Sequence, residues 1–106
     1  MSDDTEELKW EPVGKAADWA DNDARLVAIG ARRIGVYRQG EKWYALKDAC
    51  PHAGMPIHQG PIGDGNVTCP FHGWTFSLET GEGPMNTRAT TYPVRITEAG
   101  LVEVGV

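Results

Sequence analysis

The sequence predicts an all-β fold built from small antiparallel β-sheets. Three observations predict it. Turn signals recur every eight to twelve residues, the segments between them are short and rich in β-branched and aromatic residues, and the periodicity of an amphipathic helix is nearly absent. With 106 residues and a mass of 11.6 kDa, residues 1–106 are expected to form a single domain around one small core.

The expected strands can be placed in chain order from these turn signals. They lie at residues 9–13, 25–29, 33–38, 43–47, 67–69, 74–77, 91–97 and 101–104. Apolar side chains alternate with polar ones in 33–37 and 94–97, which is typical of half-buried strands. Residues 16–19 are expected to form one helical turn. Glycines at positions 40, 65, 81 and 100 supply the left-handed backbone that hairpin turns require.

The stretch from residue 48 to residue 85 differs from the rest of the chain. It holds both cysteines, all three histidines and five of the seven prolines. We therefore expect residues 48–85 to form an inserted, strand-poor subdomain that is held together by something other than an apolar core.

Charge and hydropathy exclude two classes of partner. The chain carries 10 basic and 15 acidic residues, and it has no basic stripe of the kind that nucleic-acid binding needs. Much of the acidic excess lies in residues 1–23, and residues 1–7 are expected to be a flexible acidic tail. No apolar run is long enough to span a membrane, and residues 1–13 do not resemble a signal peptide, so we expect no membrane association and a cytoplasmic protein.

Two pairs of residues indicate a metal centre. Cys50 and His52 are spaced C-x-H, Cys69 and His72 are spaced C-x-x-H, and sixteen residues (53–68) separate the pairs. Such short spacing lets one loop point both of its side chains at a single centre. A disulfide would leave the paired histidines unexplained, and a catalytic Cys–His pair needs an orienting third group. On spacing alone, structural zinc remains open, because zinc also accepts two Cys and two His ligands.

The residues around these pairs resemble the Rieske family. The motifs are C-P-H-A-G at 50–54 and C-P-F-H-G-W at 69–74, and the resemblance extends loosely over residues 9–104. This resemblance implies a sandwich or incomplete barrel of small sheets, with two ligand loops in the inserted subdomain. It also implies one 2Fe-2S cluster per chain, with Cys50 and Cys69 on one iron and His52 and His72 on the other.

The resemblance also gives a direction for the reduction potential. Neutral imidazoles leave the oxidised cluster formally uncharged, which raises the potential to about −150 to +300 mV. High-potential members of the family carry two further cysteines and hydroxyls that donate to sulfur, at positions that match Met55, Phe71, Trp74 and Phe76 here. Because those groups are missing, we expect a potential at the low end of the range.

Two further features are judged by the same likeness. Gly83, Pro84 and Met85 lie where the family carries a third, proline-containing loop over the cluster. His58 lies outside both ligand pairs and is expected to be a loop or surface histidine, because two protein ligands per iron already complete each site.

The implied function is that of a Rieske-type ferredoxin, which carries one electron from a flavin reductase to a terminal oxidoreductase such as a ring-hydroxylating dioxygenase. Such a chain is an electron-transfer component and not a catalyst alone. The wording of residues 72–81 and 91–95 also resembles the small subunit of NAD(P)H-dependent nitrite reductase, whose partner would be the large subunit. A zinc-stabilised interaction module is the alternative of another class.

Overall fold

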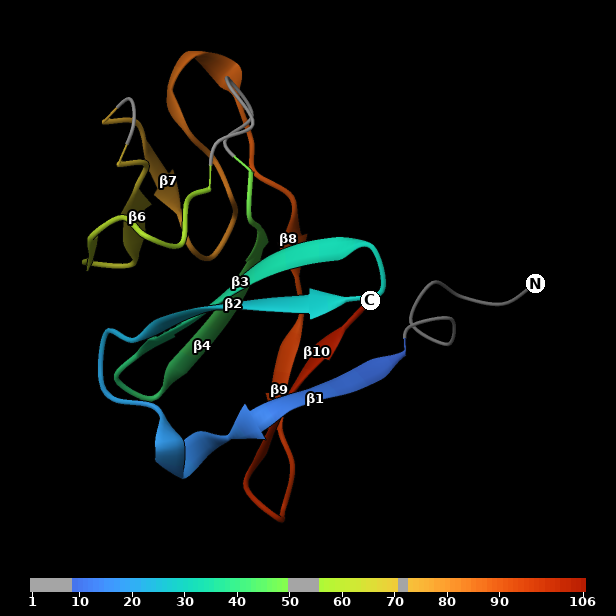
Figure 1. The fold of residues 1–106 in the computed structure, drawn as a ribbon. Coiled ribbons are helices and arrows are strands. Elements are labelled where there is room, and N and C mark those ends of the chain that lie inside the picture. Colours follow the sequence, from blue (N-terminus) through green and yellow to red (C-terminus); the bar gives the residue numbers. More distant parts are fainter. Residues whose placement is uncertain (1–8, 50–55, 71–72) are drawn as a thin grey trace.

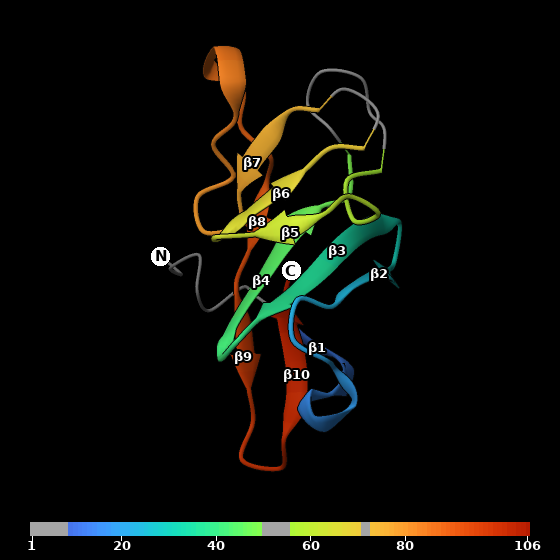
Figure 2. The same ribbon diagram turned by 90° about the vertical axis from the view of Figure 1, so that its left-hand side faces the viewer.

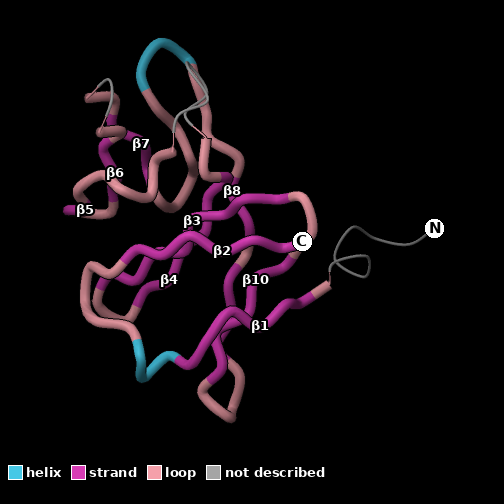
Figure 3. The backbone as a smooth tube through the Cα atoms, viewed as in Figure 1, coloured by secondary structure: helices cyan, strands magenta, loops and turns pink. Residues whose placement is uncertain are grey.

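A computed structural model describes residues 9–49, 56–70 and 73–106 of the chain. The expected tail at 1–7 lies outside these residues, as do the predicted ligands Cys50, His52 and His72. Strands dominate the described part, and its only helical pieces are two short 3₁₀ turns, η1 (Ala16–Asp18) and η2 (Pro84–Asn86) (Figure 3). The all-β prediction is confirmed. No helix among the described residues is long and apolar enough to cross a membrane.

Three antiparallel sheets make up the fold. The first has the order β1-β10-β9, from Trp10–Lys15, Leu101–Gly105 and Val94–Ile96. The second has the order β2-β3-β4-β8, from Ala24–Ile29, Arg32–Gln39, Lys42–Lys47 and Thr91–Tyr92. The third has the order β5-β6-β7, from Ile62–Gly63, Asn66–Thr68 and Thr75–Ser77. Figures 1 and 2 show the first and third sheets at opposite ends of the molecule, with the second between them.

The second sheet separates two apolar clusters, because successive side chains of β3 and β4 point to opposite faces. On one face, Ile34, Val36 and Ala45 pack with Trp19, Val102 and Val104; we call this group the basal core. On the other face, Tyr37 and Leu46 pack with residues of the 48–85 region and with Ala89; we call this group the upper core. Its remaining members are Ile57, Val67, Cys69, Phe76 and Leu78.

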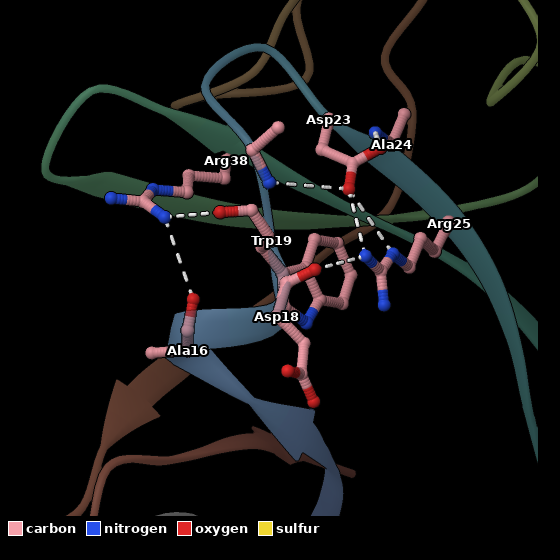
Figure 4. Close-up of polar contacts among 8 residues, drawn as sticks. Ala16, Asp18, Trp19, Asp23, Ala24, Arg25 and Arg38 are labelled. Atoms are coloured by element: carbon pink, nitrogen blue, oxygen red, sulfur yellow. Dashed lines mark hydrogen bonds and ion pairs between the residues drawn. The ribbon is translucent and has the colours of Figure 1, made fainter.

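Arginines attach the η1 segment to the second sheet, as Figure 4 shows. The guanidinium of Arg25, on β2, donates to the carbonyl oxygen of Asp18 and forms an ion pair with Asp23 at 3.0 Å. That of Arg38, on β3, donates to the carbonyl oxygens of Ala16 and Trp19. The Ala16 carbonyl also accepts the backbone N–H of Trp19, whereas Arg25 and Arg38 provide side-chain donors to the carbonyls of Asp18 and Trp19.

One predicted strand is wrong as a continuous element. The expected strand at 91–97 is divided at Pro93 into β8, which pairs with β4, and β9, which pairs with β10. Proline has no backbone N–H to donate to a ladder, so the chain changes sheets at this residue. The short strand β5 was not predicted, whereas the predicted glycine turns all adopt positive φ angles, between 62° and 81°.

Candidate functional site

The second predicted ligand loop is the tip of the β6–β7 hairpin. The strands pair in register up to Thr68 and Thr75, whose hydroxyls lie 3.1 Å apart. Beyond them, the backbone N–H of Cys69 donates to the carbonyl of Trp74 at 2.6 Å, and that of Gly73 donates to the carbonyl of Cys69 at 2.9 Å. Gly73 has a φ of 72°, which side chains disfavour. The backbone of Cys69 is therefore held from both sides.

The side chain of Cys69 is fully buried in the upper core. It contacts a cluster that includes Ile57 and Phe76, both of which are also fully buried. A metal ligand of this kind is shielded from water, and its orientation is fixed by the packing around it. A thiol at the apolar end of a tight hairpin thus fits the sulfur-ligand role that the sequence predicts for Cys69.

The described residues on either side of the first predicted ligand loop are tied together. β4 ends at Lys47, and the next residue, Asp48, has a fully buried side chain. One of its carboxyl oxygens, Oδ1, accepts hydrogen bonds from the backbone N–H groups of Ile57 and His58, both at 2.8 Å. The other, Oδ2, lies 2.7 Å from Nδ1 of His58. The carboxyl group of Asp48 therefore joins the end of β4 to residues 57–58, where the upper core begins again.

The upper core brings the described ends of both predicted loops together. Ile57 follows the first loop, Cys69 begins the second, and both pack in the same apolar cluster. The structure therefore places the two loop bases side by side, whereas the positions of Cys50, His52 and His72 fall outside the described residues.

The predicted third loop forms the turn η2 at the same end of the molecule as β7 (Figure 2). Met85 and Asn86 both have positive φ angles, and Met85 is 82% exposed. A Cβ on Gly83 would come within 2.3 Å of the ring of Phe76, so glycine lets this loop pack directly on β7.

Two buried residues near the site, Tyr37 and Asp48, were not singled out by the sequence. Tyr37 of β3 is fully buried, and among the described residues its hydroxyl has no hydrogen-bond partner. Burial raises the pKa of Tyr37, and the nearby Asp48 carboxyl group raises it further. His58 lies in a turn outside the strands, as expected of a loop histidine, and its side chain is 17% exposed and contacts the buried Asp48. No pattern in the sequence predicts a buried carboxyl group at position 48.

Comparison with known proteins agrees with this geometry. The model of the family described as "Rieske [2Fe-2S] domain" matches residues 9–94. The chain is 31% identical over 101 residues to the anthranilate 1,2-dioxygenase ferredoxin subunit of Burkholderia cepacia, covering 92% of this chain and 93% of that protein. It is 30% identical to ferredoxin CarAc of Metapseudomonas resinovorans, covering 91% of this chain and 94% of the relative.

Solved structures show the same fold. A chain in the complex of reduced oxygenase and oxidized ferredoxin of carbazole 1,9a-dioxygenase superposes with a TM-score of 0.83 at 32% identity, over 90% of this chain and 91% of that one. A Mycobacterium tuberculosis protein assigned as the small subunit of an NADH-dependent nitrite reductase superposes with a TM-score of 0.86 at 18% identity, over 93% of this chain and 96% of that one. At that identity the second likeness shows the fold alone.

Proposed function

We propose that this chain, which belongs to the Rieske [2Fe-2S] domain family and carries its 2Fe-2S cluster, is a ferredoxin that transfers one electron at a time. Its donor is a flavin reductase, and its acceptor is a terminal oxidoreductase such as a ring-hydroxylating dioxygenase. It works as an electron-transfer component in the cytoplasm and is not a catalyst alone.

The observation that carries this proposal is the extent of the likeness. The chain spans more than nine-tenths of two dioxygenase ferredoxins, with identities of 30% and 31%. It spans only 29% of the terminal oxygenase chain of a carbazole dioxygenase. The matched length is therefore that of the carrier component.

The proposed ligands are Cys50 and Cys69 on one iron and His52 and His72 on the other, with one cluster per chain. The burial of Cys69 at the hairpin tip supports the sulfur side of this assignment. When bound, the cluster supplies a site that accepts and releases a single electron. The chain itself orients the ligand loops and excludes water from Cys69 through the upper core.

The proposed cluster-binding subdomain comprises residues 48–85 within a single domain of residues 1–106. The sheet β5-β6-β7 and most of the upper core lie in its described part, which supports the boundaries. This apolar core differs from the expectation that something other than a core holds the subdomain together. The spacing of the cysteines and histidines left structural zinc open, and the family match favours a 2Fe-2S cluster over it.

The test of this function is the redox behaviour of the purified, cluster-loaded protein. In a reductive titration with dithionite, the protein should take up one electron per chain and lose visible absorbance. Cys69→Ser and His72→Ala should lose both the absorbance and the electron uptake. A colourless wild-type protein that takes up no electrons would contradict the proposal.

The second candidate is the small subunit of an NAD(P)H nitrite reductase. The resemblance of residues 72–81 and 91–95 to that subunit favours it, and the fold is compatible with it, with a TM-score of 0.86 to such a protein. A permanent subunit needs an interface that buries upwards of about 1,000 Å². Affinity purification of the chain from its own host should separate the two functions, because a subunit co-elutes with a large sirohaem flavoprotein and a ferredoxin elutes alone.

A further inference from the structure

Asp48 is the charged residue that the fold buries. Among the described residues it is the only buried polar or charged one, with 5% of its surface exposed and its side chain fully covered. Burying a carboxyl group is costly unless hydrogen-bond donors replace the lost water. Its position therefore calls for a structural reason.

Among the described residues, all the donors to the Asp48 carboxyl group come from one short segment. The backbone N–H groups of Ile57 and His58 both donate to Oδ1 at 2.8 Å, and Nδ1 of His58 lies 2.7 Å from Oδ2. The backbone of Asp48 is itself fixed, because its N–H donates to the carbonyl of Arg33 on β3 at 2.9 Å. The carboxyl group thus fastens residues 57–58 to the end of β4.

The contact between Asp48 and His58 lies against β3, where the packing is tight. A Cβ on Gly35 would approach the Tyr37 hydroxyl oxygen to 2.6 Å and the Cβ of His58 to 3.2 Å. Tyr37 and His58 therefore pack closely over the bare backbone of β3. Neither side chain can move toward the sheet to accommodate a shifted carboxyl group.

We propose that Asp48 is a positioning residue for the first ligand loop, fixing the separation of its two ends so that Cys50 and His52 are presented to the cluster. Asp48 precedes Cys50 by two residues, and its hydrogen-bond partners follow His52 by five and six. This inference rests on the proposed ligand assignment. Asp48 acts through the loop and does not touch the cluster in this role.

The test compares three variants of the cluster-loaded protein. Asp48→Asn keeps an oxygen for the two backbone donors but replaces the carboxyl oxygen opposite His58 Nδ1. Asp48→Ala removes every acceptor. Asp64→Asn is the matched control, because Asp64 is an exposed acid in the same subdomain whose φ of 51° asparagine tolerates.

The expected results concern the cluster itself. Iron release to a chelator should be at least about tenfold faster in Asp48→Ala than in the control, since hydrogen bonds to charged groups are the strong ones. Asp48→Asn should keep its cluster but show an altered EPR line shape and a higher reduction potential, because a negative charge near the site is lost. A purely structural role would leave the EPR line shape of the loaded fraction unchanged, whereas the loss of charge raises the potential in either case.

Other outcomes reject the inference in distinguishable ways. If Asp48→Asn matched Asp64→Asn in iron release, EPR line shape and potential, the positioning role would be wrong and the proposed function would stand. If Cys69→Ser kept a wild-type spectrum in the same assay, the ligand assignment itself would be wrong. Should Asp48→Ala fail to fold, Asp48→Asn alone decides.

Discussion

Gly60 shows how one residue locks the first ligand loop to the second. It is buried, its N–H donates to the carbonyl of Ile57 at 2.9 Å, and an added Cβ would lie 1.7 Å from the carbonyl oxygen of Thr68. No ordinary side chain fits at that distance. The turn after the first loop therefore rests directly on the backbone of β6, one residue before Cys69.

Gly60→Ala should destabilise the protein and loosen the cluster. The added methyl group forces residues 57–60 away from β6, at a cost of about 1–3 kcal/mol in the free energy of unfolding. Gly63→Ala is the matched control, because nothing lies within 4 Å of a Cβ there and its φ is not positive. It should stay within about 0.5 kcal/mol of wild type. Denaturant unfolding and iron release measure both, and equal behaviour of the two variants would contradict this reading.

At the residue scale, the sequence predicted the metal ligands better than the residues that hold the ligand loops in place. The short spacing of Cys69 and His72 was enough to select Cys69 as a ligand candidate. Asp48 and His58 were not selected, since an acid and a histidine in a loop ordinarily face water. The burial of Asp48 depends on its contact with His58, ten positions along the chain, which no local pattern encodes.

At the scale of elements, alternate side chains of β3 and β4 pack in the upper core, next to the site, or in the basal core, away from it. Tyr37 and Leu46 face the upper core, whereas Ile34, Val36 and Ala45 face the basal core. The alternation in 33–37 predicted that these strands are half-buried, but both faces of the sheet are covered. The sequence underestimated this burial because the second layer comes from residues 57–89, far along the chain.

Equal truncations in the two cores should affect the cluster differently. Val67 on β6 and Val102 on β10 are both fully buried, so Val67→Ala and Val102→Ala should each lower the free energy of unfolding by about 2 kcal/mol. Only Val67→Ala removes packing from the core that holds Cys69, so only it should speed iron release from the folded protein. Faster release in Val102→Ala than in Val67→Ala would show that the two cores do not have separate roles.

The division of the 91–97 strand at Pro93 could have been predicted from the proline itself. The sequence predicted one strand over 91–97 from its β-branched and aromatic residues, although proline is confined to strand edges and breaks. The structure uses this break to send the chain from the second sheet to the first. The missing N–H of Pro93 outweighs the strand propensity of its neighbours.

At the scale of the whole molecule, the fold class and the family were predictable, because they depend on strand patterning and on a short, specific loop wording. The stacking of three sheets about two cores was not predictable. It follows from register and from contacts such as those of Arg25 and Arg38, which link η1 to distant strands. These contacts become apparent only once the chain is folded.

The reduction potential should fall near the low end of the Rieske range, about −150 mV. The chain has only two cysteines, both proposed as ligands, so no disulfide can cross-link the loops. Phe76, at a position where high-potential members carry a hydroxyl, is a fully buried hydrocarbon ring that donates no such bond. Protein-film voltammetry gives the value directly. A potential in the upper part of the range would require a source of stabilisation that these residues lack.

Pulsed EPR on dithionite-reduced protein grown with isotope-labelled histidine tests the proposed coordination most directly. We predict hyperfine couplings from two histidine nitrogens in the wild type, from His52 and His72. His58→Gln should keep both couplings, because His58 contacts Asp48 and is not assigned as a ligand. A reduced cluster with no histidine coupling, or couplings that disappear with His58, would contradict the assignment of two cysteines and two histidines to the cluster.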